Sequence, residues 1–485
     1  MLHYDLESLP GRSLYEKLTD CIRTDIRNGV LRAGIKLPSK RRAAQELGVS
    51  VVTVQSAYDQ LLAEGYITSV ERSGYFVAQI ESRPAENPVL VHPAVRAASS
   101  RGPSEEERDV IDLVQSALSP DLFPLSVWTR LSHRVYSDEG ANLLRRVPYN
   151  GLLPLRVAIA DILFESRGIR TTPENIVVSA GNEQLYAALL SYFGRDAVFG
   201  VEDPGHRLIS RLYEENGAAV RYLPLDEHGV IPDALEASGA GILHISPAHH
   251  FPTGVVTPIG RRQELLAWAE RRGGYIIEDD YDSEFRMAGR PIPSLQEMDR
   301  GGRVIYINTF SKTIAPALRI AYAVLPPALA ADYRERFGFL SCPVTAAEQL
   351  ILAAFIREGY FERHINRTRT RYRALRDALL TAIQGSPKAH RYKVTQADGG
   401  LHFLLRIDTD RPDSDLREAA AAAGIRVYCL SDYAHKAEDT HTLVISYAGL
   451  PEGRVEEFVG RLDGLASLLD MGKLRKILST RFASI

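Results

Sequence analysis

A lysine flanked by hydroxyl side chains follows an apolar stretch in the second half of the chain. The segment YINTFSKTIAPALR, residues 306–319, places Lys312 directly after Ser311 and ends at Arg319. Upstream, the segment IIEDDY, residues 276–281, ends a second apolar stretch in acids and a tyrosine. A lysine in a loop is usually exposed to solvent and has no specific role. Its chemistry therefore depends on whether folding brings these two segments together.

These residue types match the needs of pyridoxal phosphate. The cofactor requires a lysine for its Schiff base, a carboxylate that keeps its ring nitrogen protonated, and donors for its phenolic oxygen and phosphate. Lys312, Asp279 and Tyr281 meet the first three needs, and Arg319 offers a bidentate cation. The remaining candidates are phosphate donors: the hydroxyls of Thr309 and Ser311, and Gly181, Asn182 and Glu183 at the start of a helix that follows NIVVSAG.

The elements that must position these residues form an alternating pattern from about residue 109 onward. Apolar runs such as NIVVSAG, AVFGVEDP, GILHISP, YIIEDDYD and RVIYINTFSK alternate with helical patterns such as EQLYAALLSYFG and RRQELLAWAERRG. This alternation predicts a mainly parallel α/β sheet, in which ligands bind beyond the carboxyl ends of the strands. Long helices, including residues 346–383, and a strand-helix-strand tail predict a second lobe.

The first eighty residues predict a winged helix-turn-helix. An amphipathic helix with Leu14, Leu18, Ile22 and Ile26 on one stripe precedes two shorter helices, which Ser39 and Ser50 can cap and Gly48 separates. A turn at residues 72–75 forms the wing. The candidate DNA contacts are Ser39, Arg41, Arg42 and Arg72 for phosphates, Ser50, Thr53 and Gln55 at the end of the third helix that meets base edges, and Gly74 in the wing.

Composition sets the boundaries and excludes some classes. Residues 80–108 are rich in Pro, Ser, Ala and charge and are expected to link domains at 1–79 and 109–485. The net charge is −3, so DNA binding would rest on a local basic cluster, Lys36 and Lys40 to Arg42. The three scattered cysteines favour neither disulfides nor a metal site, and we expect none. No signal peptide or membrane span is visible, so a cytoplasmic location is expected.

Longer motifs resemble known families. KLPSKRRAAQELGVSVVTVQSAYDQLLAEGYI and SGYFV resemble the GntR winged helices, while EDPG, HFPTG, EDDYDSEF and TFSKTIAPALR resemble the fold-type I aminotransferases. Together they resemble the MocR/GabR-type regulators over almost the whole chain. The resemblance implies that Lys312 forms the internal aldimine, Asp279 pairs with the ring nitrogen and Tyr281 bonds the phenolic oxygen. It also implies a homodimer. In a domain-swapped form of this dimer, the DNA-binding domain (the reader) of one chain rests on the aminotransferase-like domain (the sensor) of the other.

Some positions depart from the aminotransferase pattern. His206 stands where an aromatic ring usually covers the cofactor, and imidazole can still stack there. Phe251 replaces an asparagine, whose hydrogen bond His249 or His250 could supply. Val444 stands where an arginine usually grips the substrate carboxylate, so an ordinary amino acid should bind poorly unless Arg207 or Arg426 compensates.

These features predict a regulator that binds double-stranded DNA and senses pyridoxal phosphate itself or an amino compound. Three kinds of target genes remain possible: those for vitamin B6 synthesis, those for D-amino compounds or peptidoglycan, and those for amino-acid metabolism. The alternative is a pyridoxal-phosphate-dependent aminotransferase with an accessory DNA-binding head, and we expect at most weak transaminase activity. A protein that has lost its cofactor is disfavoured by the intact Lys312, Asp279, Tyr281 and Arg319.

Overall fold

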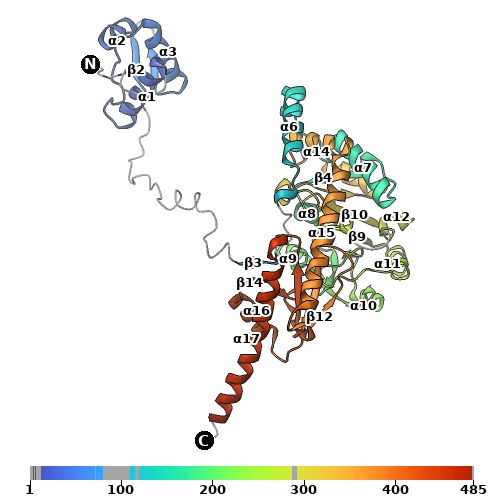
Figure 1. Cartoon of the computed structure of the whole chain (residues 1–485). Coiled ribbons are helices and arrows are strands. Elements are labelled where there is room, and N and C mark those ends of the chain that lie inside the picture. Colours follow the sequence, from blue (N-terminus) through green and yellow to red (C-terminus); the bar gives the residue numbers. More distant parts are fainter. Residues whose placement is uncertain are drawn as a thin grey trace. The chain divides into compact units, whose positions relative to one another are not determined.

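The computed structural model divides the chain into two compact units, residues 1–102 and 103–485 (Figure 1). It describes Tyr4, Leu6 and residues 13–70, 73–79, 110–114, 120–286 and 292–482. The predicted linker at 80–108 and the wing residue Arg72 lie outside the described residues. Each unit is therefore described by itself.

The small unit is a three-helix core closed by a hairpin. Its elements are α1 (Leu14–Arg27), α2 (Lys40–Leu47), α3 (Val51–Ala63), β1 (Ile67–Val70) and β2 (Gly74–Val77). Leu18, Ile22 and Ile26 of the predicted stripe are buried in this core, as are Val54 and Leu61 of α3. Leu14, at the first position of α1, is 43% exposed and lies off the core.

Capping residues define the helix-turn-helix. The Ser39 hydroxyl accepts a hydrogen bond from the Arg42 amide at 3.3 Å, and the Ser50 hydroxyl accepts one from the Thr53 amide at 3.0 Å. Each hydroxyl thereby satisfies an amide that would lack a partner at the start of its helix. Gly48 ends α2 at φ +67°, a left-handed conformation that few other residues adopt. The two helices therefore begin at the predicted residues.

An eight-stranded sheet forms the centre of the large unit, in the order β4-β11-β10-β9-β8-β5-β6-β7. The strands are β4 (Ile176–Ser179), β5 (Val198–Asp203), β6 (Ala219–Asp226), β7 (Gly229–Val230), β8 (Ile242–Ile245), β9 (Tyr275–Asp279), β10 (Val304–Thr309) and β11 (Ala321–Val324). The five strands from β10 to β6 are parallel to one another, and β11 is antiparallel to both of its neighbours. All five predicted strands are present, and the mainly parallel arrangement is confirmed.

Helices flank this sheet and continue into a second lobe. They are α6 (Leu125–Glu139), α7 (Leu153–Arg167), α8 (Asn182–Phe193), α9 (Arg207–Glu215), α10 (Pro232–Ser238), α11 (Ile259–Arg272), α12 (Leu295–Met298), α13 (Pro327–Phe337), α14 (Ala346–Arg357), α15 (Tyr360–Gly385), α16 (Asp413–Ala422) and α17 (Val455–Phe482). The helical pattern at 346–383 is interrupted at Gly359, where φ is +71°, and it forms two helices. None of the helices in the described part of the chain is long and apolar enough to cross a membrane.

The second lobe contains a smaller antiparallel sheet, in the order β12-β13-β16-β15. Its strands are β12 (Tyr392–Thr395), β13 (His402–Ile407), β15 (Tyr428–Cys429) and β16 (Thr442–Ser446), and a short pair joins β3 (Ile111–Asp112) to β14 (Ile425–Arg426). One continuous hydrophobic core includes Phe310 after β10, Phe355 of α14 and Phe403 of β13. The strand that begins at His402 is therefore held firmly beside the carboxyl ends of the large sheet.

Candidate functional site

A cavity of about 350 Å³ lies where the central parallel strands end. Nine of the ten predicted cofactor residues line it: Asn182, Glu183, His206, Asp279, Tyr281, Thr309, Ser311, Lys312 and Arg319. The tenth, Gly181, lies against the Arg319 guanidinium. The fold thus gathers segments that are more than a hundred residues apart, because neighbouring parallel strands place their carboxyl ends at one edge of the sheet.

Asp279 lies at the end of β9 within a network of buried donors. It accepts hydrogen bonds from the hydroxyl of Tyr186 and, at 3.4 Å, from the side-chain amide of Asn182. The Nε2 atom of His244 lies 3.9 Å from its carboxylate, and the Nδ1 atom of His244 faces the Tyr213 hydroxyl at 2.8 Å. Burial raises the pKa of Tyr186 well above its usual value, and the Asp279 charge adds to that shift. Tyr186 therefore remains a hydroxyl donor that orients the carboxylate.

Lys312 extends into the cavity from the loop after β10. Burial lowers the pKa of its amine from the usual value, and the Asp282 carboxylate opposes that shift. Lowering the pKa of a lysine enlarges the fraction of free amine, which is the nucleophilic form. The amine is thus suited to form a bond with a carbonyl carbon.

Arg319 and the hydroxyls of the cavity are suited to an anion. Arg319 forms an ion pair with Glu183, and both side chains remain partly exposed. The Ser311 hydroxyl and the Asn182 side-chain oxygen are buried without a hydrogen-bond partner among the described residues. Buried polar atoms rarely stay unpaired, so their position points to a ligand with complementary groups. These residues fit the phosphate and ring of pyridoxal phosphate.

Gly181 lets the chain pass close to Arg319. Its φ is +90°, and a Cβ atom at this position would overlap the Arg319 guanidinium. We expect Gly181→Ala to lower the affinity for pyridoxal phosphate by about 10-fold to 100-fold, the value of one or two hydrogen bonds to a charged group. Titration of the apoprotein with cofactor, followed by absorbance, measures this change.

Gly194 offers a matched control for this prediction. Its φ is +88°, but nothing lies within 4 Å of where its Cβ would be. Gly194→Ala therefore introduces the same backbone strain without displacing Arg319. Equal losses of cofactor affinity in both variants would contradict a role for the space beside Arg319.

His206 and Phe251 also line the cavity, with ring centroids 5.6 Å apart. His249 and His250 are not among the lining residues; they contact Asp282 and Glu202 instead. Burial raises the pKa of Glu202 to about 8 and lowers that of His250 to about 3. The Nε2 atom of His250 lies 3.3 Å from the Glu202 carboxylate, and burial disfavours the charged form of both groups.

The two predicted effector arginines lie in different places. Arg207 begins α9 and lines a second cavity of about 930 Å³, which shares His206, Ser246 and Phe251 with the first. Arg426 lies on β14 in an ion pair with Asp112 at 2.8 Å and is not among the residues lining either cavity. Val444 is buried in β16 between β13 and β15, where it adds no cation.

The predicted DNA contacts fall on two helices and the wing of the small unit. Arg41 and Arg42 are exposed on α2, and Arg42 forms an ion pair with Glu46 at 2.9 Å. On α3, Gln55 is exposed, and the Ser50 and Thr53 hydroxyls bond one another at 2.8 Å. Gly74 begins β2 at φ +111°, which permits the tight turn of the wing.

Sequence reasoning missed several residues at both sites. Val52 is 72% exposed at the start of α3, beside the predicted base readers, where an apolar side chain can contact a thymine methyl group. Tyr186 and His244 surround Asp279, and His402 lines the cofactor cavity from the second lobe. The one available signal was the i to i+4 spacing of Asn182 and Tyr186 on a helix.

Two family models match separate parts of the chain. Residues 14–77 match the family of bacterial regulatory proteins of the gntR family, and residues 108–462 match aminotransferase class I and II. Two solved aminotransferases share the fold of the large unit. Kynurenine aminotransferase of Pyrococcus horikoshii has a TM-score of 0.65 at 22% identity, covering 80% of this chain and 96% of that one. LysN, the α-aminoadipate aminotransferase of Thermus thermophilus, has a TM-score of 0.65 at 25% identity, covering 77% and 98%.

Full-length relatives are regulators. YdeL, an uncharacterized HTH-type transcriptional regulator of Bacillus subtilis (strain 168), is 34% identical over 93% of this chain and 96% of its own length. MocR, the probable rhizopine catabolism regulatory protein of Rhizobium meliloti, is 32% identical over 95% and 94%. PdxR, the pyridoxine biosynthesis transcriptional regulator of Corynebacterium glutamicum, is 32% identical over 87% and 89%.

A winged helix joined to an aminotransferase fold with this site defines a class of DNA-binding transcription regulator. The chain belongs to the MocR-like family of HTH-type transcriptional regulators, in which a GntR domain accompanies an aminotransferase class I and II domain. The predicted fold class, the regulator function and pyridoxal phosphate as cofactor are thereby confirmed.

Proposed function

We propose that the large unit is the sensor of this regulator, and that Lys312 is the residue through which it responds to pyridoxal phosphate or to an amino compound. The observation that carries the proposal is a half-buried lysine with a lowered pKa, in one cavity with the carboxylate of Asp279 and the cation of Arg319. A working sensor needs a ligand whose affinity differs between two arrangements of the protein.

Each residue of the cavity has a distinct part in this proposal. When bound, pyridoxal phosphate supplies an electrophilic carbon on which one amine can replace another. Lys312 presents the amine and Asp279 holds a proton on the ring nitrogen. Tyr281, whose hydroxyl donates to the His249 carbonyl at 3.1 Å, would turn that donor toward the phenolic oxygen. Arg319, Thr309, Ser311 and the start of α8 bind the phosphate. His206 covers one face of the ring.

The second cavity is our candidate for the effector. It adjoins the cofactor cavity through His206 and Phe251, and Arg207 at its wall can pair with an anionic group of an incoming amine. An amine that displaces Lys312 would have to enter beside these residues. If no amine changes the absorbance of the bound cofactor, pyridoxal phosphate itself is the signal.

Measurements of DNA binding test the proposed role of the small unit as the reader. We expect the purified protein to bind the DNA upstream of its own coding sequence, and Gln55→Ala to lose about 1–3 kcal/mol of discrimination at one base pair. Arg41→Ala should weaken binding to all sequences equally and reduce the salt dependence, because it would lose a phosphate contact. Fluorescence anisotropy with the native site and single-base variants measures both effects.

Gln60, in the last turn of α3, is an exposed glutamine on the same helix and serves as the control. Gln60→Ala should keep both affinity and discrimination. A chain that fails to bind its upstream DNA, with and without cofactor, would contradict the proposed regulator.

A dimer is the second part of the proposal. A two-fold dimer would carry two readers and would require paired half-sites in the promoter, including when each reader rests on the partner's sensor. Light scattering, together with footprinting of the upstream DNA, tests this arrangement.

The rival function is an aminotransferase, favoured by the presence of both Lys312 and Asp279 in the cavity. Val444 and its neighbours in β16 provide no cation for a substrate carboxylate, and a substrate without a clamp rarely reaches a reactive pose. Multiple turnovers with an amino donor and a 2-oxo acid would favour this rival over the sensor.

A further inference from the structure

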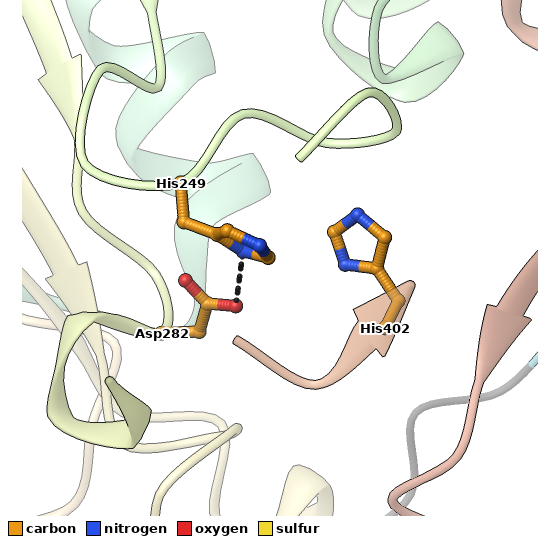
Figure 2. A group of neighbouring side chains, drawn as sticks. All are labelled: His249, Asp282 and His402. Atoms are coloured by element: carbon orange, nitrogen blue, oxygen red, sulfur yellow. Dashed lines mark hydrogen bonds and ion pairs between the residues drawn. The ribbon is translucent and has the colours of Figure 1, made fainter. Parts of the chain in front are cut away.

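Three potential metal ligands meet beside the cofactor cavity: His249, Asp282 and His402 (Figure 2). His249 lies in the loop after β8, Asp282 in the loop after β9, and His402 at the start of β13. One nitrogen from each imidazole and one carboxylate oxygen lie within 4.8 Å of one another. All three residues are buried. His249 was a candidate partner of the cofactor but does not line its cavity, while Asp282 and His402 line the cavity without a role in the proposal above.

We propose that His249, Asp282 and His402 form a binding site for a divalent transition metal, with zinc as the best-fitting ion. Two imidazoles and one carboxylate are the ligands of many catalytic and regulatory zinc sites, and they leave a fourth position open. Imidazole nitrogen selects ions of this kind over magnesium and calcium, which prefer oxygen.

The hydrogen bonds around the cluster support this assignment. The Nε2 atom of His402 faces the Pro252 carbonyl at 3.1 Å, and donating its proton there leaves Nδ1 with a lone pair. Histidines that bind metals are commonly oriented by such a carbonyl. In Figure 2 the His402 and His249 rings lie beside one another.

His249 supplies a second, independent observation. Its Nδ1 atom lies 3.0 Å from the Asp282 carboxylate. An ion bound between these two atoms would take the place of that direct contact. Ligand atoms around tetrahedral zinc are about 3.3 Å apart, given bonds of about 2.0–2.1 Å, so His249 and Asp282 already have nearly that separation.

Two further features allow a metal to reach and close the site. Asp282 and His402 line the cofactor cavity, and His249 and Asp282 line a separate cavity of about 500 Å³, so the cluster lies between two spaces. The centroids of the His402 and His249 rings are 4.7 Å apart, so a small shift would bring the third ligand into range. A bound ion would then tie the second lobe, through β13, to two loops of the large sheet.

Zinc binding to the full-length protein tests this inference. Protein treated with a chelator is dialysed against buffered zinc, and bound metal is measured by mass spectrometry, with and without pyridoxal phosphate. We expect one zinc per chain, and His249→Gln or His402→Gln should lower the affinity by more than about 100-fold, because losing a ligand costs more than losing a partner that only orients a ligand. His228, exposed in the turn before β7, provides the control His228→Gln, which should bind zinc normally.

X-ray absorption at the zinc edge keeps the inference testable if a variant does not fold. In the unaltered protein, two imidazole nitrogens and a carboxylate oxygen at about 2.0–2.1 Å would support the site. Substoichiometric zinc, sulfur ligands, or equal affinity in all four proteins would overturn it and leave the cluster a buried hydrogen bond. The readout does not need the cofactor, so it can succeed even if the proposed sensor role fails.

Discussion

Lys312→Ala is expected to abolish the covalent attachment of pyridoxal phosphate. Borohydride reduction of the unaltered protein should leave the cofactor on one peptide, the one that contains Lys312, because this is the half-buried amine with a lowered pKa in the cavity. In the variant the visible absorbance of the bound cofactor should disappear, and no labelled peptide should remain. Absorbance spectra and peptide mass mapping measure both results.

Lys393 provides a matched control, since it is an exposed lysine on β12, away from the cavity. Lys393→Ala should keep the absorbance and the label on Lys312. Labelling that persists in Lys312→Ala at another lysine would show that the assignment of the reactive amine is wrong. The variant also separates sensing from DNA binding, because the small unit is unchanged.

Asp279→Asn is expected to lower the affinity for pyridoxal phosphate by about 100-fold or more. Breaking a buried charge pair from one side typically costs about 3–5 kcal/mol, because the remaining charge loses its partner. Asparagine has nearly the same shape as aspartate, so the hydroxyl of Tyr186 keeps a neighbour of similar size. The loss would therefore report the missing charge opposite the ring nitrogen. Titration of the apoprotein with cofactor measures it.

Two other variants serve as comparisons for Asp279→Asn. Asp196→Asn changes an exposed aspartate in the loop before β5 and should leave the affinity unchanged. Tyr186→Phe keeps the Asp279 charge but removes its donor, and it should cost about 10-fold, the value of one hydrogen bond to a charged group. If Asp279→Asn binds the cofactor as tightly as the unaltered protein, the proposed pairing with the ring nitrogen is contradicted.

Much of the fold followed from local patterns. Ser39 and Ser50 marked helix starts because a hydroxyl satisfies a free amide wherever it precedes a helix. The five apolar runs marked strands because a parallel strand is buried on both faces. The antiparallel position of β11 could not be predicted, since the sequence does not state the direction in which a strand is inserted.

For the candidate site, too, some features could be predicted from the sequence and others could not. Lys312, Asp279, Tyr281 and Arg319 were identifiable because each carries a group that the cofactor demands, and each lies just beyond or shortly after a predicted strand. The ion pair of Arg319 with Glu183 was not, since it depends on a left-handed turn at Arg319, φ +49°, that few residues other than glycine adopt.

The sequence by itself therefore determined which chemistry this protein carries: a DNA reader, a lysine and the partners of pyridoxal phosphate. Tertiary structure alone decided which side chains act together. Tyr186 and His244 reach Asp279, and His402 reaches His249 and Asp282, only because the carboxyl ends of β8 and β9 lie beside the start of α8 and the start of β13. Such contacts leave no periodic signal along the chain, because they are set by the order of strands in the sheet and the packing of one lobe on the other.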